Sequence, residues 1–320
     1  MDSNYNRPRL IVLIRHGESE SNKDKTINEV TPNHLIPLTP YGKKQANLAG
    51  VKLLNLLNVG NKEVIDALSE KYALPGTHKT LELRDYHPKQ DNVDTNIVFY
   101  TSPYKRTRQT LKGILDVIDE YNELNNGVHM CEGLSYNPGG KQKHAVWPHD
   151  LENSGVYEND ESTHCTDGPE QQTKYLRYRI IDEPRLREQD FGNYQEVSSM
   201  QDVMEKRKTY GHFFFRFPEG ESAADVYDRV ASFQDTLYRH FQFKTLSQGR
   251  DVVVLVTHGI YSRVFLMKWF RWTYEEFESF TNVPNGSLMV MELDENLNKY
   301  VLRTVLPKWS TLEAENELMT

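Results

Sequence analysis

Two turns that contain histidine and glycine follow directly on strongly apolar segments of this chain. Residues 15–17 read Arg-His-Gly after the apolar run 10–14, and residues 257–259 read Thr-His-Gly after the apolar run 252–256. Folding alone does not require such turns at the ends of buried strands. Because ligands of open α/β sheets bind beyond the carboxyl ends of the strands, both turns predict a functional site there.

The residue types in these turns suit a small dianion. Gly17 and Gly259 allow the backbone to approach a ligand closely, and Arg15 offers a planar fork that matches phosphate or carboxylate oxygens. His16 and His258 would add two imidazoles to this positive pocket, although either one alone could be a strand-end histidine bonded to backbone carbonyls. Their repetition favours the functional interpretation, and phosphate is the ligand that fits best.

A second arginine near the end of the strand predicted at residues 96–100 would complete an anion clamp. Arg106 and Arg108 are both candidates, but residues two positions apart on a helix point to different sides, so only one can face the site. The alternative for either side chain is a solvated position on the helix surface.

Glu188 is the best candidate for a general acid. It lies in the segment Leu-Arg-Glu-Gln-Asp-Phe-Gly, where a mixture of apolar and charged residues could bury it in part and favour its protonated form. A surface position beside Arg187 is the plain alternative, and Asp190 and Glu183 stay open as other acids.

Other combinations of residues carry less weight. Two cysteines and four histidines fall between residues 129 and 165 without the CxxC or HxxxH spacing of zinc sites, so we predict neither a metal nor another cofactor. The Gly-Gly-Lys at residues 139–141 lacks the remaining residues of a phosphate-binding loop. The aromatic run 213–217 is expected in the core, and the basic run 206–208 on a solvated helix face.

Strands that alternate with amphipathic helices would hold these residues in place. Thr39 as N-cap and Pro40 after it predict a helix between the strands 10–14 and 96–100, which would form a βαβ unit. Further elements are expected after Pro103 (a helix), near 200–208 (a short helix), from Ser222 (a long helix), at 252–256 (a strand), 261–270 (a helix), 287–293 and 300–305 (closing strands). This order predicts an α/β fold, a three-layer αβα sandwich around a mostly parallel central sheet.

Two segments interrupt this alternation. Residues 58–94 are polar and irregular, and residues 125–179 are rich in Gly, Asn, His and acidic residues without a sustained period. We interpret both as insertions, about 58–95 and 125–180, and the second as a lid or partly ordered loop. Because neither a repeat nor a clean linker divides the chain, residues 1–320 are expected to form a single domain.

Composition narrows the class of protein. The chain has 320 residues, 38% of them hydrophobic, and a formal net charge of −8, which argues against a nucleic-acid binder. Two cysteines provide no disulfide framework and fit a reducing compartment. Signal peptide, membrane helix and lipidation motifs are all missing from the sequence, so we expect a cytoplasmic protein without an integral membrane segment. The sequence does not predict its oligomeric state.

Taken in order, these motifs resemble those of the histidine phosphatase superfamily, also called the phosphoglycerate-mutase-like family. The resemblance covers about residues 10–57, 96–122 and 184–305 and leaves the two insertions outside. It rests on Arg15 to Ser19 with Asn22, the helix start 39–46, Thr101-Ser102-Pro103 with Arg106, Leu186-Arg187-Glu188, Gly220-Glu221-Ser222 and Thr257-His258-Gly259. The fold implied is the phosphoglycerate-mutase-like α/β fold.

The resemblance also implies residue roles. His16 would be the nucleophile that forms a phosphohistidine, and Glu188 would protonate the leaving oxygen and then activate water. The phosphoryl oxygens would be bound by Arg15, Arg106 and His258, with Asn22 and the backbone of Gly259 as lesser contacts. The resemblance favours Arg106 over Arg108 and Glu188 over Asp190. Nearby positive charges would keep His16 neutral below its reference pKa of ~6.5, and the arginines would replace a metal ion in offsetting charge.

Within the superfamily, the chain is more similar to the phosphatase branch. Mutases carry an Arg-Arg pair after the acid-bearing turn, whereas residues 191–196 here read Phe-Gly-Asn-Tyr-Gln-Glu, and Ser21 replaces the mutases' Trp before Asn22. The expected activity is therefore hydrolysis of a small phosphomonoester by an acid phosphatase. A bisphosphoglycerate-dependent mutase and a non-catalytic phospho-ligand-binding scaffold are the alternatives. Within this branch the whole chain is most similar to a fungal cytosolic acid phosphatase, and that closer resemblance implies a link to intracellular sterol transport, for which no residue argues independently.

Overall fold

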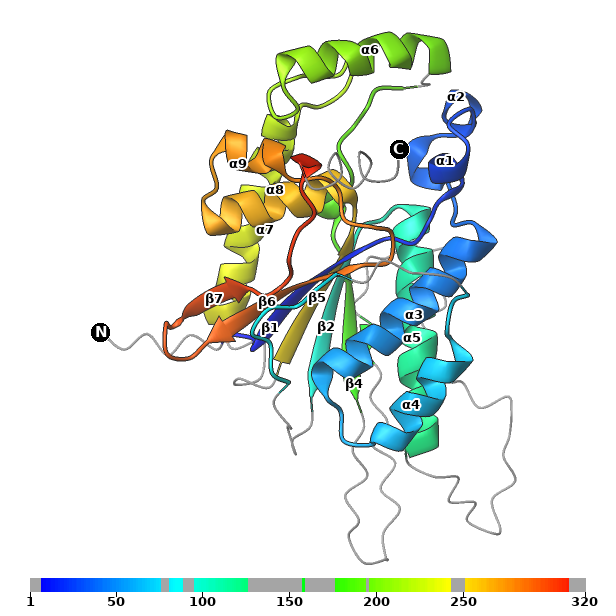
Figure 1. Ribbon diagram of the computed structural model, residues 1–320, viewed down its shortest axis with the longest axis vertical. Helices are drawn as coiled ribbons and strands as arrows, with labels where there is room; N and C mark the ends of the chain where they lie inside the picture. Colours follow the sequence, from blue (N-terminus) through cyan, green and yellow to red (C-terminus); the bar gives the residue numbers. More distant parts are fainter. Residues whose placement is uncertain are drawn as a thin grey trace, which may run out of the picture.

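The computed structural model describes residues 7–75, 81–88, 95–125, 157–158, 176–193, 196–242 and 251–310. Within this part of the chain, a seven-stranded sheet runs in the order β3-β4-β2-β5-β1-β6-β7 (Figure 1). Four parallel strands form its centre: β4 (Arg177–Asp182), β2 (Asn96–Thr101), β5 (Asp251–Thr257) and β1 (Leu10–Arg15). Antiparallel strands lie at its edges: β3 (Tyr157–Glu158), β6 (Leu288–Asp294) and β7 (Lys299–Leu302).

Helices cover both faces of this sheet, as Figure 1 shows. One face carries α3 (Pro40–Leu57), α4 (Lys62–Lys71) and α5 (Lys105–Asn125), and the other carries α7 (Ala223–Gln242) and α8 (Gly259–Phe270). The remaining described helices are α1 (Glu20–Lys23), α2 (Ile27–Val30), η1 (Asn33–Leu35), η2 (Pro184–Leu186), α6 (Val197–Tyr210) and α9 (Tyr274–Ser279). The predicted three-layer αβα sandwich with a mostly parallel central sheet is confirmed.

Strand β1 shows why the first apolar run is continuous. Leu10, Val12 and Ile14 belong to the core beneath α3 and α5, whereas Ile11 and Leu13 belong to the core beneath α7 and α8. A strand with both faces covered needs apolar side chains at every position, so it reads as an unbroken apolar run rather than an alternating one.

The helix predicted from Thr39 and Pro40 forms as expected. The backbone N–H of Gly42 donates to the hydroxyl of Thr39 at 2.9 Å, which caps the first turn of α3. α3 then packs closely on α5, since a Cβ atom added at Gly113 would lie 2.7 Å from the Cβ of Ala46. The N–H of Thr39 donates to the carbonyl oxygen of Glu18 at 2.9 Å, which holds the start of α3 against the turn that follows β1.

The register between β1 and β5 brings the two histidine turns together. Arg15 pairs with Thr257 in this parallel ladder, so the residues that follow, His16 and His258, leave the sheet side by side. The strands 10–14 and 96–100 are parallel, as the predicted βαβ unit requires, but β5 lies between them. A local sequence pattern cannot reveal that a strand from a distant part of the chain is inserted there.

The segment 58–94 is not irregular throughout, so that part of the prediction is wrong. Residues 62–71 form α4, and the side chain of Asn61 accepts a hydrogen bond from the N–H of Val64 at its start. Ile65 and Leu68 are buried against α3 and α5. The apolar positions of this helix are few and are hidden among charged residues, which explains why its period was missed.

Strand β4 was also missed, because residues 177–180 fall within the second predicted insertion. Tyr178 and Ile180 are buried in the core, while arginines alternate with them along the strand. β4 pairs in parallel with β2 and extends the sheet directly before the acid-bearing segment. The rest of that insertion, and with it the predicted lid, lies outside the described residues, apart from β3 and residues 125 and 176.

Helix α6 is longer than the helix expected near residues 200–208, and its basic run is not wholly solvated. Arg207 is 7% exposed, and its guanidinium lies 5.3 Å from the centre of the Phe217 ring. Phe213 and Phe217 are buried, as predicted for the aromatic run, whereas Phe214 is half exposed. In the described part of the chain, no helix combines the length and apolar character needed to cross a membrane.

Candidate active site

His16 lies immediately beyond the end of β1 and is 4% exposed. Its backbone N–H donates to the carbonyl oxygen of Thr257 at 3.0 Å, which fixes the turn to the neighbouring strand. The ring Nδ1 lies 2.7 Å from the carbonyl oxygen of Gly17. A carbonyl can only accept, so Nδ1 carries the proton in this contact, and the neutral ring keeps a lone pair on Nε2.

Gly17 serves close packing of the backbone. A Cβ atom at this position would lie 2.3 Å from the carbonyl oxygen of Gly42 in the first turn of α3. The N–H of Gly17 donates to Thr110 Oγ1 at 3.0 Å. Gly259 is crowded by Asn282, whose Cγ would lie 2.8 Å from an added Cβ. Both glycines therefore have a structural requirement that the sequence did not reveal.

His258 is fully buried and forms the N-cap position of α8. Its Nε2 lies 2.8 Å from the hydroxyl oxygen of Ser102, at the end of β2. The rings of His16 and His258 meet edge to face, with their centres 5.1 Å apart. Three neighbouring strands thus each contribute a polar residue to one point beyond their carboxyl ends. The contact of Ser102 with a histidine was not anticipated.

The two candidate arginines of α5 point to different sides, as their spacing predicts. Arg106 is buried, and its Nη1 donates to the backbone and side-chain oxygens of Asn33 at 2.7 and 2.9 Å. Its guanidinium lies 4.9 Å from the centre of the Tyr104 ring, which itself packs edge to face on the His258 ring. Arg108 instead forms an ion pair with Asp182 at the end of β4.

Burial and positive charge determine the protonation of the histidines. The pKa of His16 is held well below its usual value by burial first, and then by the charges of Arg106 and Arg15. Burial first, and then the nearby positive charges of Arg106 and Arg229, hold the pKa of His258 well below its usual value. Burial lowers the pKa of Arg106 to about 10, while the Glu188 carboxylate opposes this shift. At neutral pH both imidazoles are therefore neutral, and Arg106 remains charged.

Glu188 is 8% exposed, and its carboxylate lies at the start of α8, next to the helix position that His258 caps. Its Oε1 accepts hydrogen bonds from the backbone N–H groups of Gln189 at 3.0 Å and Tyr261 at 3.2 Å. The other carboxylates considered are engaged differently. Glu183 forms an ion pair with Arg185 at 2.7 Å. Asp190 accepts from the N–H of Gly192 at 2.9 Å within its own turn.

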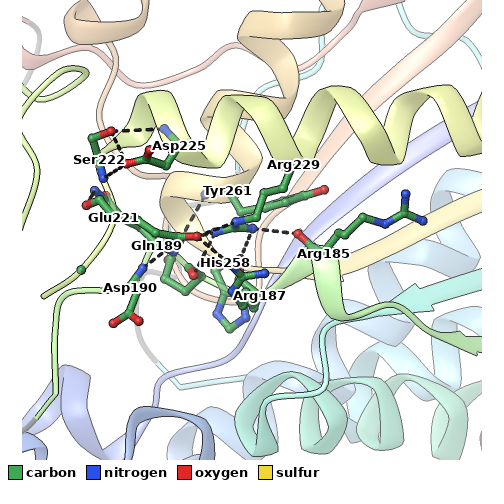
Figure 2. Close-up of polar contacts among 12 residues, drawn as sticks. Arg185, Arg187, Gln189, Asp190, Glu221, Ser222, Asp225, Arg229, His258 and Tyr261 are labelled. Atoms are coloured by element: carbon green, nitrogen blue, oxygen red, sulfur yellow. Dashed lines mark hydrogen bonds and ion pairs between the residues drawn. The ribbon is translucent and has the colours of Figure 1, made fainter.

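Arg229 in α7 holds the segment that carries Glu188. Its Nη1 donates to the carbonyl oxygens of Arg185 at 2.7 Å and Arg187 at 2.8 Å, and its Nη2 donates to that of Glu188 at 3.0 Å. Figure 2 shows this side chain reaching from the helix across the loop. The Glu221 carboxylate neutralises the guanidinium at 3.0 Å. Sequence reasoning missed Arg229, since it lies in mid-helix outside any motif.

The side chain of Asn22 caps the start of α1, so its carbonyl oxygen is already engaged within the protein. Its Oδ1 accepts from the backbone N–H of Ser19 at 3.0 Å and from the Ser19 hydroxyl at 2.9 Å. Asn285 Nδ2 lies 3.3 Å from the same oxygen and also donates to the carbonyl oxygen of His16 at 3.0 Å. Asn22 is thus joined through Asn285 to the turn that carries His16.

The donor set of this site suits an anion. Two guanidinium groups, Arg15 and Arg106, lie close enough to His16 to shift its pKa, and such charges oppose a metal cation. Among the described residues, no group of three or more His, Cys, Asp or Glu side chains has the arrangement of a metal site. The cysteines and histidines at residues 129–165 lie outside the described part.

Comparison with known proteins points in the same direction. The sequence model of the histidine phosphatase superfamily (branch 1) matches residues 170–305. The chain is 67% identical over 311 residues to the broad-range acid phosphatase DET1 of Saccharomyces cerevisiae, covering 97% of this chain and 92% of that protein. It is 34% identical over 292 residues to the phosphoglycerate mutase-like protein AT74H of Arabidopsis thaliana, covering 89% and 74% of the two chains.

The fold is also similar to a solved structure. Mycobacterial hydrolase 1 superimposes with a TM-score of 0.51 at 14% identity, covering 95% of this chain and 98% of that one. At this identity the likeness concerns the fold alone.

Proposed function

The chain belongs to the histidine phosphatase superfamily, and we propose that it is an acid phosphatase that hydrolyses small phosphomonoesters through a phosphohistidine on His16. One observation carries this proposal: His16 is buried and neutral, with a lone pair on Nε2, beside a second neutral histidine and two arginines. The identity of 67% with a broad-range acid phosphatase supports the same class of reaction.

In the first step, His16 Nε2 forms a bond to phosphorus while the bond to the leaving oxygen breaks. Arg15 and Arg106 offset charge on the equatorial oxygens, and their fixed positions avoid reorganisation during the transfer. The carboxyl group of Glu188 gives its proton to the leaving oxygen. A neutral nucleophile is required here, which the lowered pKa of His16 provides even on the acid side of neutrality.

In the second step, the Glu188 carboxylate takes a proton from water, and the water oxygen attacks phosphorus. The bond between phosphorus and His16 Nε2 breaks, and inorganic phosphate leaves. His258 and Arg106 would hold the phosphoryl oxygens in both steps, with Asn22 and the backbone of Gly259 as lesser contacts. Since the arginines supply the positive charge, the proposed reaction needs no metal ion.

Arg229 acts in this proposal as a positioning residue for Glu188. Its guanidinium donates to three carbonyl groups along this segment, those of Arg185, Arg187 and Glu188, and its side chain is 10% exposed. The N–H of Tyr261 then fixes the carboxylate from the other side at 3.2 Å. A general acid must lie within hydrogen-bond reach of the leaving oxygen, so this anchoring bears directly on the rate.

The proposal also includes the domain organisation, the location and the ligand class that the sequence predicts. We propose one domain over residues 1–320, because the two cores lie on opposite faces of the same sheet. A cytoplasmic location is proposed from the low cysteine content. A small phosphomonoester is the proposed partner, with no nucleic acid, given the net charge of −8. The link to sterol transport stays a prediction of the resemblance alone.

The experiment is a kinetic assay of the purified chain with p-nitrophenyl phosphate in EDTA at acid pH. Sustained turnover with release of inorganic phosphate is expected. Rapid conversion of 3-phosphoglycerate to 2-phosphoglycerate in the presence of 2,3-bisphosphoglycerate would instead identify a mutase. Phosphate binding without turnover would identify the non-catalytic scaffold.

A further inference from the structure

A cavity of about 390 Å³ lies between α3, residues 81–88 and the start of β6. Its volume falls within the range of about 300–1,000 Å³ that small-molecule sites have. Most of its wall is apolar, formed by Leu56, Leu81, Leu83, Leu288 and Val290. None of the side chains placed in the candidate active site lines it.

The wall formed by residues 81–88 is anchored to the rest of the fold. The N–H of Arg84 donates to the carbonyl oxygen of Arg303 at 2.8 Å, and the N–H of Val305 donates to that of Glu82 at 2.9 Å. The hydroxyl of Tyr86 also donates to the carbonyl oxygen of Leu56 at 2.6 Å. These bonds hold the cavity open as a preformed feature of the fold.

Two polar side chains of the cavity have no hydrogen-bond or ion-pair partner among the described residues. Lys52 is half-buried in the wall, and burial with no contribution from a charged neighbour lowers its pKa. Ser287 is 2% exposed, and its hydroxyl has no hydrogen-bond partner within the part of the chain that the structure describes. A buried hydroxyl without a partner costs free energy, as does a cation held against apolar side chains.

A ligand with an apolar body and an anionic head would satisfy every one of these features. Its body would cover the leucines, its head would neutralise Lys52, and a head-group oxygen could accept from the Ser287 hydroxyl. Among the described residues that line the cavity, none is a carboxylate that could compete for Lys52. We propose that this cavity is a second binding site, specific for a small amphipathic anion such as a medium-chain carboxylate.

The test is isothermal titration of the full chain with decanoate, decanol and acetate, in buffer with saturating inorganic phosphate to occupy the active site. Decanoate is expected to bind, with decanol and acetate each at least about tenfold weaker, because one lacks the charge and the other the apolar body. Displacement of decanoate by phosphate, equal binding of decanol, or no binding of decanoate would each overturn the proposal.

Variants of one helix provide the matched control. Lys52→Met should weaken decanoate binding about tenfold, whereas Lys44→Met, which removes the same charge from an exposed position of α3, should leave it unchanged. Lys52→Arg should retain most of the affinity. Since Lys52→Met removes a charge from an apolar wall, it should fold at least as stably as the parent chain. Equal affinity in Lys52→Met and the parent chain would contradict the proposal.

Ser287→Ala gives an independent readout. Removing an unpaired buried hydroxyl should leave the unfolding temperature of the ligand-free chain unchanged or raise it, while the gain in unfolding temperature on adding decanoate should shrink. An unchanged gain would mean that the hydroxyl does not contact the ligand, contrary to the proposed pose.

Discussion

The two sides of the candidate active site are built in different ways. His16 and His258 leave the sheet at the ends of adjacent paired strands, and a backbone hydrogen bond of 3.0 Å joins the turns. Glu188 lies on an irregular segment after η2, where no strand pairing holds it. Its position depends on side chains from α7 and on the start of α8. The sheet fixes the phosphoryl side, whereas a partly buried ion pair between Arg229 and Glu221 fixes the acid side.

This difference separates two kinds of kinetic effect. Groups on the phosphoryl side act on every substrate, because each phosphomonoester presents the same phosphoryl group. Groups on the acid side act on the leaving oxygen, so their effect should depend on how well that oxygen leaves without a proton. Comparing p-nitrophenyl phosphate, which has a good leaving group, with an alkyl phosphate therefore distinguishes the two sides.

Among the substitutions considered, replacement of the proposed nucleophile His16 should lower kcat the most. His16→Ala is expected to lower kcat by at least about 10⁴-fold for both substrates, because the covalent step is lost. Steady-state kinetics measure this, and circular dichroism checks that the variant is folded. Undiminished turnover in His16→Ala would rule out the nucleophile assignment.

Loss of the proposed general acid Glu188 should lower kcat to different extents for the two substrates. Glu188→Gln keeps the shape of the side chain but cannot donate a proton, so kcat for an alkyl phosphate should fall about 10²–10⁴-fold. For p-nitrophenyl phosphate we expect a fall of less than about tenfold. An equal loss for both substrates would place Glu188 on the phosphoryl side instead.

The two arginines of α5 offer a matched pair. Arg106→Met should lower kcat/KM by about 10²–10³-fold for both substrates, since it removes charge stabilisation from the phosphoryl oxygens. Arg108→Met breaks the partly exposed ion pair with Asp182 and should change kcat/KM less than about twofold. Similar losses of kcat/KM in the two variants would contradict the conclusion that Arg106, and not Arg108, lies at the site.

Substitution of Arg229 tests whether the action of Glu188 depends on the side chain that holds its segment in place. Arg229→Met should lower kcat for an alkyl phosphate about 10–100-fold with a smaller change for p-nitrophenyl phosphate, and Arg229→Lys should restore part of the loss. Arg187→Met is the control, because Arg187 also pairs with Glu221 but its side chain is 40% exposed. If both substrates lose rate equally in Arg229→Met, the residue is only structural.

The pH dependence of stability probes the histidine pair. Folded His16 and His258 have pKa values well below ~6.5, so below that pH the unfolded state binds more protons than the folded state. Stability should therefore be full above pH ~6.5 and fall by up to about 1.4 kcal/mol per pH unit for each histidine as the pH decreases. Urea unfolding of the parent chain and His16→Gln measures this, and the variant should show the shallower slope. Equal slopes would contradict a shifted pKa for His16.

The phosphoryl side could be predicted from the sequence because its parts are local. His16 and His258 each follow an apolar run that marks a buried strand, and the carboxyl end of a parallel strand is a known place for a ligand. The spacing of Arg106 and Arg108 correctly predicted that they point to different sides. Fold class followed from the alternation of strands and helices for the same reason.

The remaining features depend on contacts between distant segments, which no local pattern displays. Arg229 binds the segment of Glu188, which lies about 40 residues away in the chain. The Ser102 hydroxyl contacts His258 because the strands that precede them, β2 and β5, are neighbours in the sheet. In β4, arginines alternate with buried side chains over residues 177–180 only, a strand pattern too short to stand out beside a segment without a period. The cavity beside Lys52 arises only when residues 81–88 pair with the segment 303–305.

The most direct test of the account is to trap the phosphoryl enzyme. The chain is mixed rapidly with an excess of phosphomonoester, quenched in alkali to preserve a phosphorus–nitrogen bond, and digested for mass spectrometry. We predict a phosphoryl group on His16 that disappears in His16→Ala and persists longer in Glu188→Gln, where water activation is lost. A phosphoryl group on any other residue, or turnover without one, would contradict the account.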